Sequence, residues 1–406
     1  MPMTLSLNSI PRTILEVRTD SNYRDDIIKT GQLLFYDHAR RGKSAMLGGV
    51  RLSNAMVELS PMDYKEANTK FQHNAFLFCA KKACEISGTT APETFEDVKR
   101  RGQEFYANEI FVKCLQGIIQ DVITPILPAV YSEAVSRFAE VVEVDFMETY
   151  TVSVSSNEVP VFQDAAWGAS RSVPGNRFYS KDYTLNPQPR TAEIVMRFMQ
   201  MIGNGMDYGV YFANLVAGMY AKTMGMWSAM MTAAASNTAL IPSGLKANFS
   251  SVNWVTIANK LMAVNNVELD NLIAYGNLVA LSKVLPTQAT GSTNVNMDAA
   301  LAMLLGREYV RDAQLGEYMG VRLMPLRDAV VPGTQNTGVT TILDPTKVWL
   351  MAANRRKPLV IGYNAATPIT IEIEAMKNPA FEYSVNMTIS LDSVSIFASK
   401  VGLLNI

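Results

Sequence analysis

Histidine and cysteine, the most versatile side chains for catalysis and metal binding, are scarce in this chain. The two histidines are His38 and His73, and the three cysteines are Cys79, Cys84 and Cys114. An odd number of widely spaced cysteines does not indicate a disulfide framework. Two histidines with these cysteines also do not match the ligand spacing of a zinc site. We therefore expect inert thiols in a reducing compartment, no bound metal and no cofactor.

Two glycine motifs copy parts of nucleotide-binding loops. Residues 42–44 read Gly-Lys-Ser, the end of a phosphate-binding loop, but Asp37 stands where that loop needs a glycine. The carboxylate of Asp37 would repel a phosphate group. Residues 203–209 contain glycines at the wrong spacing for a dinucleotide-binding loop, and they follow a helical pattern rather than a strand. We interpret the first match as chance and the second as a helix bend.

General acid–base chemistry would have to come from carboxylates or lysines. No clustered pair of acids stands beside an apolar segment, and the Gly-x-Ser-x-Gly nucleophile motif is missing. The basic cluster at 355–357 precedes Pro358 and is interpreted as a solvated turn, with a nucleic-acid contact as the alternative. The sequence therefore predicts a protein that is not an enzyme. A cytoplasmic enzyme with an unrecognised site is the less favoured alternative.

The composition favours a chain that is buried in an assembly. Of 406 residues, 48% are hydrophobic and 18% are charged, below the roughly 25% of typical soluble domains. The 23 methionines have flexible side chains that adapt to different packings, which suits a subunit repeated in unequal positions. A net charge of -1 gives no overall attraction to nucleic acid or to an anionic membrane. The N-terminus lacks a signal-peptide pattern, so we expect the protein to stay in the cytoplasm.

The N-terminal part of the chain is predicted to be an arm followed by helices. Residues 1–60 are polar and interrupted by glycines, which indicates an extended arm with one short helix at 25–36. A helix is expected from residue 61 to about 86. A second helix, with acidic residues in its first turn, is expected to begin after residue 93 and to continue to about 120.

A long hairpin is predicted in the central part of the chain. Apolar and polar residues alternate at 150–155 and again around 183–185, which is the period of a strand. Glycine- and proline-rich segments lie between these stretches. An isolated hairpin is only marginally stable in water. Residues 145–187 are therefore expected to form an exposed hairpin that rests on an adjacent subunit.

A long helix is expected at 191–245, capped by Thr191. From residue 198 to 245 the only charged residues are Asp207 and Lys222. A membrane span at 210–235 is the alternative, but Lys222 lies in the middle of that segment and no basic residues mark its ends. We interpret the segment as a helix covered by protein on most sides, which would be the spine of the fold.

The C-terminal part of the chain is predicted to change from helices to strands. Residues 252–330 are expected to be helical with short breaks, including an apolar stripe at 297–305. Strict alternation at 369–374 and at 383–391 indicates antiparallel strands with one buried face. Helices and strands in separate runs predict an α+β fold.

The order of these elements resembles that of tailed-bacteriophage major capsid proteins of the Hong Kong 97 type. The resemblance covers about residues 118–406, and Lys181 lies where some relatives carry a cross-linking lysine. Residues 1–117 look too regular for a removable scaffolding segment, so no cleavage is expected. The segments that carry the resemblance are 121–126 with 141–144 before the extended loop, 157–161 with 165–168 in its ascending strand, the late strand region 349–368, and the terminal strand region 400–406.

The resemblance implies a Hong Kong 97-type capsid fold that is divided into five segments. These are an N-terminal arm and helical region at 1–117, an approach segment and extended β-hairpin loop at 118–190, a peripheral domain with the spine helix at 191–245, an axial domain at 246–368, and C-terminal strands returning to the peripheral domain at 369–406.

The resemblance also implies a major capsid protein, forming hexamers and pentamers of an icosahedral shell around double-stranded DNA. The expected partners are further copies of the chain, portal and scaffolding proteins during assembly, packaged DNA through weak local contacts, and decoration proteins, without a membrane. The shell would assemble in the host cytoplasm and become the virion capsid. An encapsulin-like bacterial nanocompartment shell is the alternative.

A set of aromatic, basic and methionine side chains is predicted to form the assembly interface. Some lie in the expected hairpin and some on the expected spine helix. For the spine residues, contact with the chain's own axial domain is the alternative to contact with another subunit. The predicted residues are Trp167, Arg171, Arg177, Tyr179, Met219, Met226 and Trp227.

Overall fold

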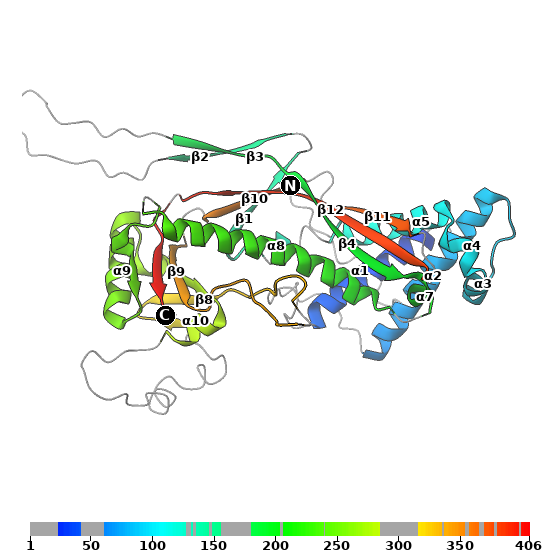
Figure 1. Cartoon of the computed structure of the whole chain (residues 1–406), viewed down its shortest axis with the longest axis horizontal. Helices are drawn as coiled ribbons and strands as arrows, with labels where there is room; N and C mark the ends of the chain where they lie inside the picture. Colours follow the sequence, from blue (N-terminus) through cyan, green and yellow to red (C-terminus); the bar gives the residue numbers. More distant parts are fainter. Residues whose placement is uncertain are drawn as a thin grey trace, which may run out of the picture.

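The computed structural model shows an elongated chain whose long axis is followed by one long helix (Figure 1). The expected N-terminal arm and the apolar stripe at 297–305 lie outside the residues that the structure describes. The described residues are 23–41, 61–126, 131–132, 135–145, 148–155, 180–203, 206–238, 240–284, 316–334, 337–353, 357–364, 369–376, 380–397 and 399–406.

The helices of the N-terminal part pack on one another at one end of the molecule (Figure 1). The helices expected at 25–36 and at 61–86 are confirmed as the first two of them. Both begin and end within a few residues of the predicted bounds. The full set is α1 (Tyr23–Arg41), α2 (Pro61–Ser87), α3 (Phe95–Arg100), α4 (Gly102–Tyr106) and α5 (Glu109–Ile123).

The single helix expected from residue 93 to about 120 is wrong, because local caps divide it into three. Thr94 and Asp97 form a capping box at the start of α3, in which the Thr94 hydroxyl accepts the Asp97 N–H at 3.3 Å. Arg101 ends α3 and precedes α4. The Asn108 side chain then accepts two N–H groups of the first turn of α5, at 3.0 and 3.1 Å.

The first sheet is built around the 14-residue strand β12 (Glu382–Ser395). Three strands pair with β12 in the antiparallel sense, and β1 pairs with β10 in parallel. The strands expected at 369–374 and 383–391 are confirmed as β11 and β12. The neighbours in this sheet are β4 (Gln188–Arg197), β11 (Thr370–Ala375), β10 (Leu359–Asn364) and β1 (Ala139–Val144).

The helix start predicted at Thr191 is wrong, because Thr191 lies in the middle of strand β4. All ten residues of β4 pair with β12. This pairing joins segments almost 200 positions apart, and it outweighs the local capping signal that suggested a helix. Helical structure begins at Phe198, first as the short helix α7 (Phe198–Ile202) and then, after a break, as α8.

Helix α8 (Tyr208–Ser236) confirms the predicted long apolar helix over most of its length. Its 29 residues extend about 44 Å. Asp207 caps it, with the carboxylate accepting the Val210 N–H at 3.1 Å. No helix in the described part of the chain is both long and apolar enough to cross a membrane.

The second sheet lies at the other end of α8, beside helix α9 (Ser251–Asn265) and the short helix α10 (Leu278–Ser282) (Figure 1). The helices predicted within 252–330 are confirmed for α9 and α10, but β6, β7 and β8 are strands. In spatial order the sheet contains β5 (Lys246–Asn248), β13 (Gly402–Asn405), β9 (Lys347–Ala352), β6 (Leu272–Gly276), β8 (Val321–Pro325) and β7 (Glu317–Tyr318).

The C-terminal strands are shared between the two sheets. Strands β11 and β12 join β4 in the first sheet, whereas β13 pairs with β5 and β9 in the second. The C-terminal part of the chain thus contributes strands to both sheets. The bounds of the five predicted segments remain predictions.

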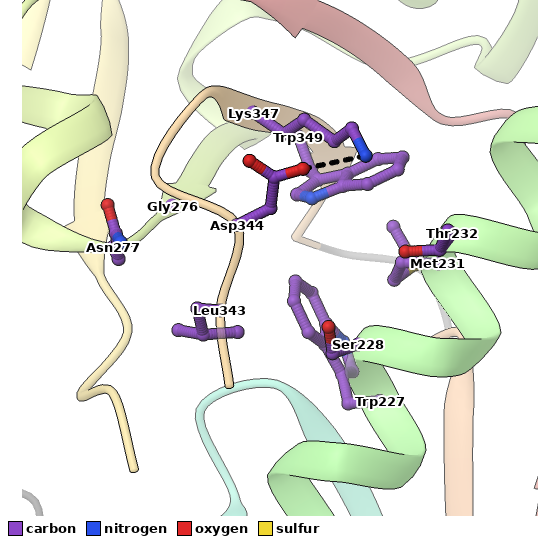
Figure 2. Close-up of a pocket in the computed structure, with 10 residues that line it drawn as sticks. All are labelled: Trp227, Ser228, Met231, Thr232, Gly276, Asn277, Leu343, Asp344, Lys347 and Trp349. Atoms are coloured by element: carbon purple, nitrogen blue, oxygen red, sulfur yellow. Dashed lines mark ion pairs between the residues drawn. The ribbon is translucent and has the colours of Figure 1, made fainter. Parts of the chain in front are cut away.

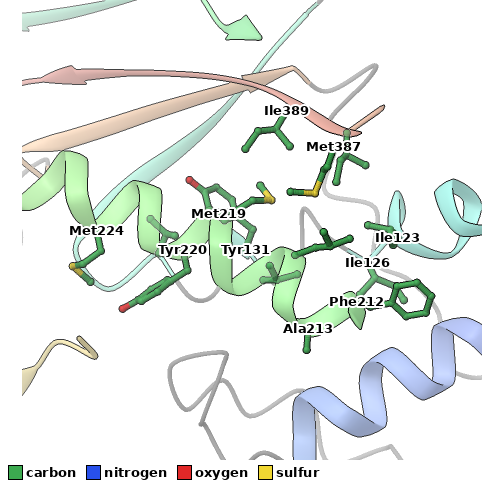
Figure 3. Packing of buried hydrophobic residues seen from close by; sticks show 14 of the residues in the cluster. Ile123, Ile126, Tyr131, Phe212, Ala213, Met219, Tyr220, Met224, Met387 and Ile389 are labelled. Carbon is green, nitrogen blue, oxygen red and sulfur yellow. The ribbon is translucent and has the colours of Figure 1, made fainter. Parts of the chain in front are cut away.

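Buried apolar side chains form one large cluster that reaches from α1 to β13. Figure 3 shows Phe212 and Met219 of α8 among side chains that include Ile123 from α5 and Met387 from β12. The hydroxyl groups of Tyr131 and Thr223 lie 2.6 Å apart inside this core and satisfy each other. Helices and two mixed sheets pack around this common core, and the predicted α+β class is confirmed.

Candidate assembly surface

A two-stranded hairpin stands apart from both large sheets (Figure 1). Strands β2 (Tyr150–Ser155) and β3 (Ser180–Leu185) are antiparallel, with Tyr150 opposite Leu185 and Ser155 opposite Ser180. The strands predicted at 150–155 and 183–185 are confirmed. Within the described residues, these two strands pair only with each other.

The base of the hairpin is anchored on strand β10. Val152 and Leu185 are buried against Val360 and Ile396, in a small cluster separate from the main core. Leu185 also approaches Gly362 closely, since a Cβ added to that glycine would lie 3.5 Å from the Leu185 Cβ. A Cβ at position 362 would thus be in ordinary contact with the hairpin, and its tightest neighbour would be a methyl group of Val144 at 3.1 Å.

Beyond this base, the side chains of β3 are polar and exposed. Ser180, Lys181 and Asp182 all face solvent. Asp182 accepts a hydrogen bond from the Ser153 hydroxyl at 2.5 Å, and the Lys181 ammonium lies 4.9 Å from the centre of the Tyr183 ring. The first contact joins the two strands and the second lies within β3, and neither attaches the hairpin to the body. Among the described residues of the hairpin, the buried contacts with the body lie at its base.

Four predicted interface residues come between β2 and β3 in the sequence, outside the described residues. They are Trp167, Arg171, Arg177 and Tyr179. Their part in assembly remains a prediction.

Helix α9 lies at the end of the molecule farthest from α3 and α4 (Figure 1), and three valines are exposed on its solvent side. Its inner face buries Trp254 and Leu261 in the core. Lys260 is the only charged residue of this 15-residue helix. Exposed apolar side chains continue on α10 at the same end of the chain. We call these residues the end face: Val252 (62% exposed), Val255 (51%), Val264 (47%), Leu278 (47%) and Val279 (53%).

The end face was missed by sequence reasoning, although a signal was present. A helix of this length normally carries several charges on its solvent side. Here the exposed side carries three valines among Thr256, Asn259 and Lys260, so only one of its side chains is charged. Exposed apolar side chains that gather on a soluble chain typically mark an interaction surface. The end face is therefore a second candidate for contact between chains.

Two of the predicted interface residues on α8 belong to the chain's own core. Met219 is 4% exposed and Trp227 is 2% exposed. The Trp227 ring meets Phe138 at 6.0 Å and Trp349 of β9 at 6.5 Å, both nearly perpendicular. These side chains therefore have almost no area left for a second subunit. Trp227 instead fastens α8 to the second sheet, the alternative that the sequence had left open.

Figure 2 shows the junction between α8 and the second sheet, with Trp227 and Trp349 beside the ion pair of Asp344 and Lys347. The two charged groups lie 2.8 Å apart. The free space at this point is about 10 Å³, room for no more than one water molecule. The junction is a packed contact between elements, and it has no space for a substrate.

Met226 differs from its neighbours on α8, because it is only partly buried. It lines an open, largely apolar groove of about 290 Å³ together with Met230, Leu240 and Phe397. The Ser393 hydroxyl donates a hydrogen bond to the Met226 sulfur at 3.4 Å. The role of Met226 in assembly remains a prediction.

A further pocket of about 270 Å³ lies between the two sheets and contains cationic side chains. Arg137 and Lys357 line it, and Lys357 donates to the Ala139 carbonyl at 3.5 Å. Burial lowers the pKa of Lys357, and nearby Glu140 acts in the opposite direction. The described residues that line the pocket include no carboxylate that could act as a base. In the described part of the chain, no three His, Cys, Asp or Glu side chains are grouped as metal ligands.

No family model and no curated protein matches this sequence. Solved structures do match. The capsid structure of the cyanophage P-SCSP1u matches with a TM-score of 0.41 and 11% identity, over 66% of this chain and 86% of that one. The mature capsid of bacteriophage PhiM1 matches with a TM-score of 0.37 and 13% identity, over 66% and 85%. A virus-like particle from Pyrococcus furiosus matches with a TM-score of 0.32 and 11% identity, over 66% and 90%.

In fold, the chain resembles phage capsid proteins. The order of elements expected from that resemblance is present, since a hairpin precedes a long apolar helix, which is followed by a second sheet and by long C-terminal strands. Each TM-score is below 0.5, so the evidence for function comes from the hairpin and the end face of this chain.

Proposed function

We propose that this chain is the major capsid protein of a tailed bacteriophage, a structural subunit whose copies build a closed icosahedral shell. The observation that carries the proposal is the hairpin of β2 and β3, which is anchored at its base and exposed beyond it. A two-stranded hairpin is marginally stable in water by itself. The surface of a second copy of the chain would supply the cover that this hairpin lacks.

The end face supports the same proposal from a second surface of the subunit. Its valines are exposed at one end of an elongated chain, where copies arranged in a ring would meet. Head-to-tail contacts of this kind close into rings when the rotation between copies is right. Hexamers and pentamers would then share one interface, which needs side chains that tolerate small changes in packing. Apolar residues without fixed hydrogen-bond partners meet that need.

The proposed shell encloses double-stranded DNA. A chain with a net charge of -1 has no strong field toward DNA, so contacts with the genome would be local and weak. Portal and scaffolding proteins would act during assembly in the host cytoplasm, and decoration proteins could bind the finished capsid. In this proposal the chain performs no catalysis.

The direct test is electron microscopy of the purified full-length protein with negative stain, combined with sedimentation velocity. Closed shells of uniform size are expected. A variant lacking residues 165–178, with β2 and β3 retained, should remain a folded and soluble subunit that makes no closed shells. Normal shells from this variant would contradict the role of the hairpin.

The end face is tested by Val255→Asp, with Ile86→Asp as its control. Both wild-type residues are exposed, Val255 at 51% and Ile86 at 66%, so neither change should unfold the subunit. If copies cover Val255, the carboxylate would be buried without a partner at a cost of several kcal/mol. Val255→Asp should therefore give few or no shells, and Ile86→Asp should assemble. Equal shell yields from the two variants would exclude the end face as an interface.

A further inference from the structure

Two of the three cysteines meet where helices α2 and α5 pack together, although they stand far apart in the sequence. Cys79 of α2 is fully buried, and Cys114 of α5 is partly exposed. Their thiol groups are hydrogen-bonded to each other. The helices are also in close contact one turn earlier, where the Phe76 and Phe111 rings lie 5.8 Å apart. Each phenylalanine precedes its cysteine by three positions, so both pairs belong to the same packed interface.

We propose that Cys79 and Cys114 form a redox-sensitive pair that closes into a disulfide and joins α2 to α5. The two cysteines stand three positions after the Phe76–Phe111 contact of the α2–α5 interface, and their thiols interact. A disulfide would join the two sulfur atoms at roughly 2.05 Å. Both thiols are free in this structure. This inference does not depend on the proposed shell function.

The surroundings of the pair assign different roles to its two sulfur atoms. The hydrogen bond with Cys79 lowers the pKa of Cys114; burial opposes this, and the positive charges of Arg24 and Lys82 lower it further. Burial raises the pKa of Cys79, and contact with Cys114 raises it further. Cys114 is thus the more acidic and more accessible thiol. It is the one that a reagent from solution meets first.

The oxidant in this proposal is a small-molecule disulfide such as glutathione disulfide. The Cys114 thiolate attacks one of its sulfur atoms, forming a mixed disulfide and releasing one glutathione thiolate. Cys79 then gives up its proton and attacks the Cys114 sulfur, which releases the second glutathione. That glutathione leaves as a thiolate and takes up the proton. The pair has lost two electrons and two protons, and the glutathione disulfide has been reduced to two thiols.

The third cysteine provides a matched control. Cys84 is also on α2 and is also buried, but its sulfur contacts Arg101 at 3.6 Å instead of another thiol. A reaction that depends on the pairing of Cys79 with Cys114 should leave Cys84 reduced. Random oxidation after unfolding would involve all three cysteines.

The test is to treat the reduced, folded full-length protein with glutathione disulfide, to alkylate the remaining thiols, and to map disulfides by mass spectrometry without reduction. The wild type and Cys84→Ala should both yield the peptide pair that links residues 79 and 114. Cys79→Ala should stop at a stable glutathione adduct on Cys114, and Cys114→Ser should give neither link nor adduct. The oxidised wild type should also melt at a higher temperature than the reduced protein, whereas Cys114→Ser should show no such difference.

Several results would overturn the proposal. The first is a wild-type protein that keeps a glutathione adduct on Cys114 without forming the link. The second is a wild-type protein in which neither cysteine reacts, and the third is a link that involves Cys84. A 79–114 link without a higher melting temperature would overturn the stabilising effect of the bond. The wild-type map by itself decides whether the disulfide forms, so a variant that fails to fold leaves the test intact.

Discussion

Leu185 packs the base of the hairpin against the body, and Leu185→Ala should destabilise this contact selectively. The side chain is fully buried in the small cluster with Val152, Val360 and Ile396, which is separate from the main core. Its removal should therefore leave the two large sheets and α8 unchanged. The predicted result is local opening of β2 and β3 in a subunit that remains folded.

The size of this effect follows from the burial of Leu185 and the small size of its cluster. Truncating a buried leucine to alanine costs about 2–5 kcal/mol, with the lower values at sites that can relax. The cluster contains only four fully buried side chains, so water and neighbouring groups can enter the space. We expect about 2 kcal/mol, which corresponds to about a 30-fold change in the opening equilibrium of the hairpin.

Hydrogen exchange on the unassembled subunit measures this opening residue by residue. The amides of β2 and β3 should lose about 30-fold in protection in Leu185→Ala, while those of α8 keep theirs. Leu261→Ala, a truncation at a fully buried site of the main core, is the control and should lower protection across the second sheet. Equal loss in α8 and in the hairpin of Leu185→Ala, or no loss in the hairpin, would refute the separate anchoring of the hairpin.

Three further predictions concern the elements that hold the body together. Trp227→Ala should lower the free energy of unfolding in urea by about 3–5 kcal/mol, and Trp227→Phe should cost much less, because the indole N–H is buried with no hydrogen-bond partner in the described structure. Asn108→Ala should cost about 1 kcal/mol through loss of the α5 cap, and Asn108→Asp, which keeps an acceptor, should be nearly neutral in the same measurement. For Asp344, burial tends to raise the pKa, but hydrogen bonds from Lys347 and Thr346 outweigh it and lower the pKa below its usual value. The contribution of the Asp344 carboxylate to the stability of the fold is therefore complete above the ordinary aspartate pKa of about 3.9, and it is lost as the pH falls through the lowered value. Asp344→Asn should have a lower melting temperature than the wild type at neutral pH and the same melting temperature in strong acid.

The strands of the hairpin could be predicted from the sequence because their signal is local. In β2, Val152 is buried and Val154 partly buried, while Thr151 and Ser153 are exposed, and this alternation follows from the geometry of one strand. The same reasoning found β11 and β12. It also found most of α8, whose apolar length exceeds what a strand normally has. Helix α2 was found from Pro61 at its first turn and Gly88 after its end.

The helix start predicted at Thr191 was wrong because the structure of that segment depends on a distant partner. Residues 188–197 contain Thr191 and Glu193 at the spacing of a helix start, and nothing nearby contradicts a helix. All ten residues pair with β12, and the local sequence pattern does not predict this pairing. Which side of α9 is buried could not be predicted from the sequence for the same reason, because this depends on where the second sheet packs.

Composition and short-range periodicity were enough to predict the α+β class, the hairpin strands, the long apolar helix and the shortage of catalytic and metal-binding side chains. The folded chain was needed to show that Met219 and Trp227 are core residues, that the valines of α9 are exposed, and that Cys79 meets Cys114. These outcomes depend on which distant segments pack together. The physical reason is that burial is a property of the assembled layers, and a side chain of given polarity can serve either in a core or at an interface between chains.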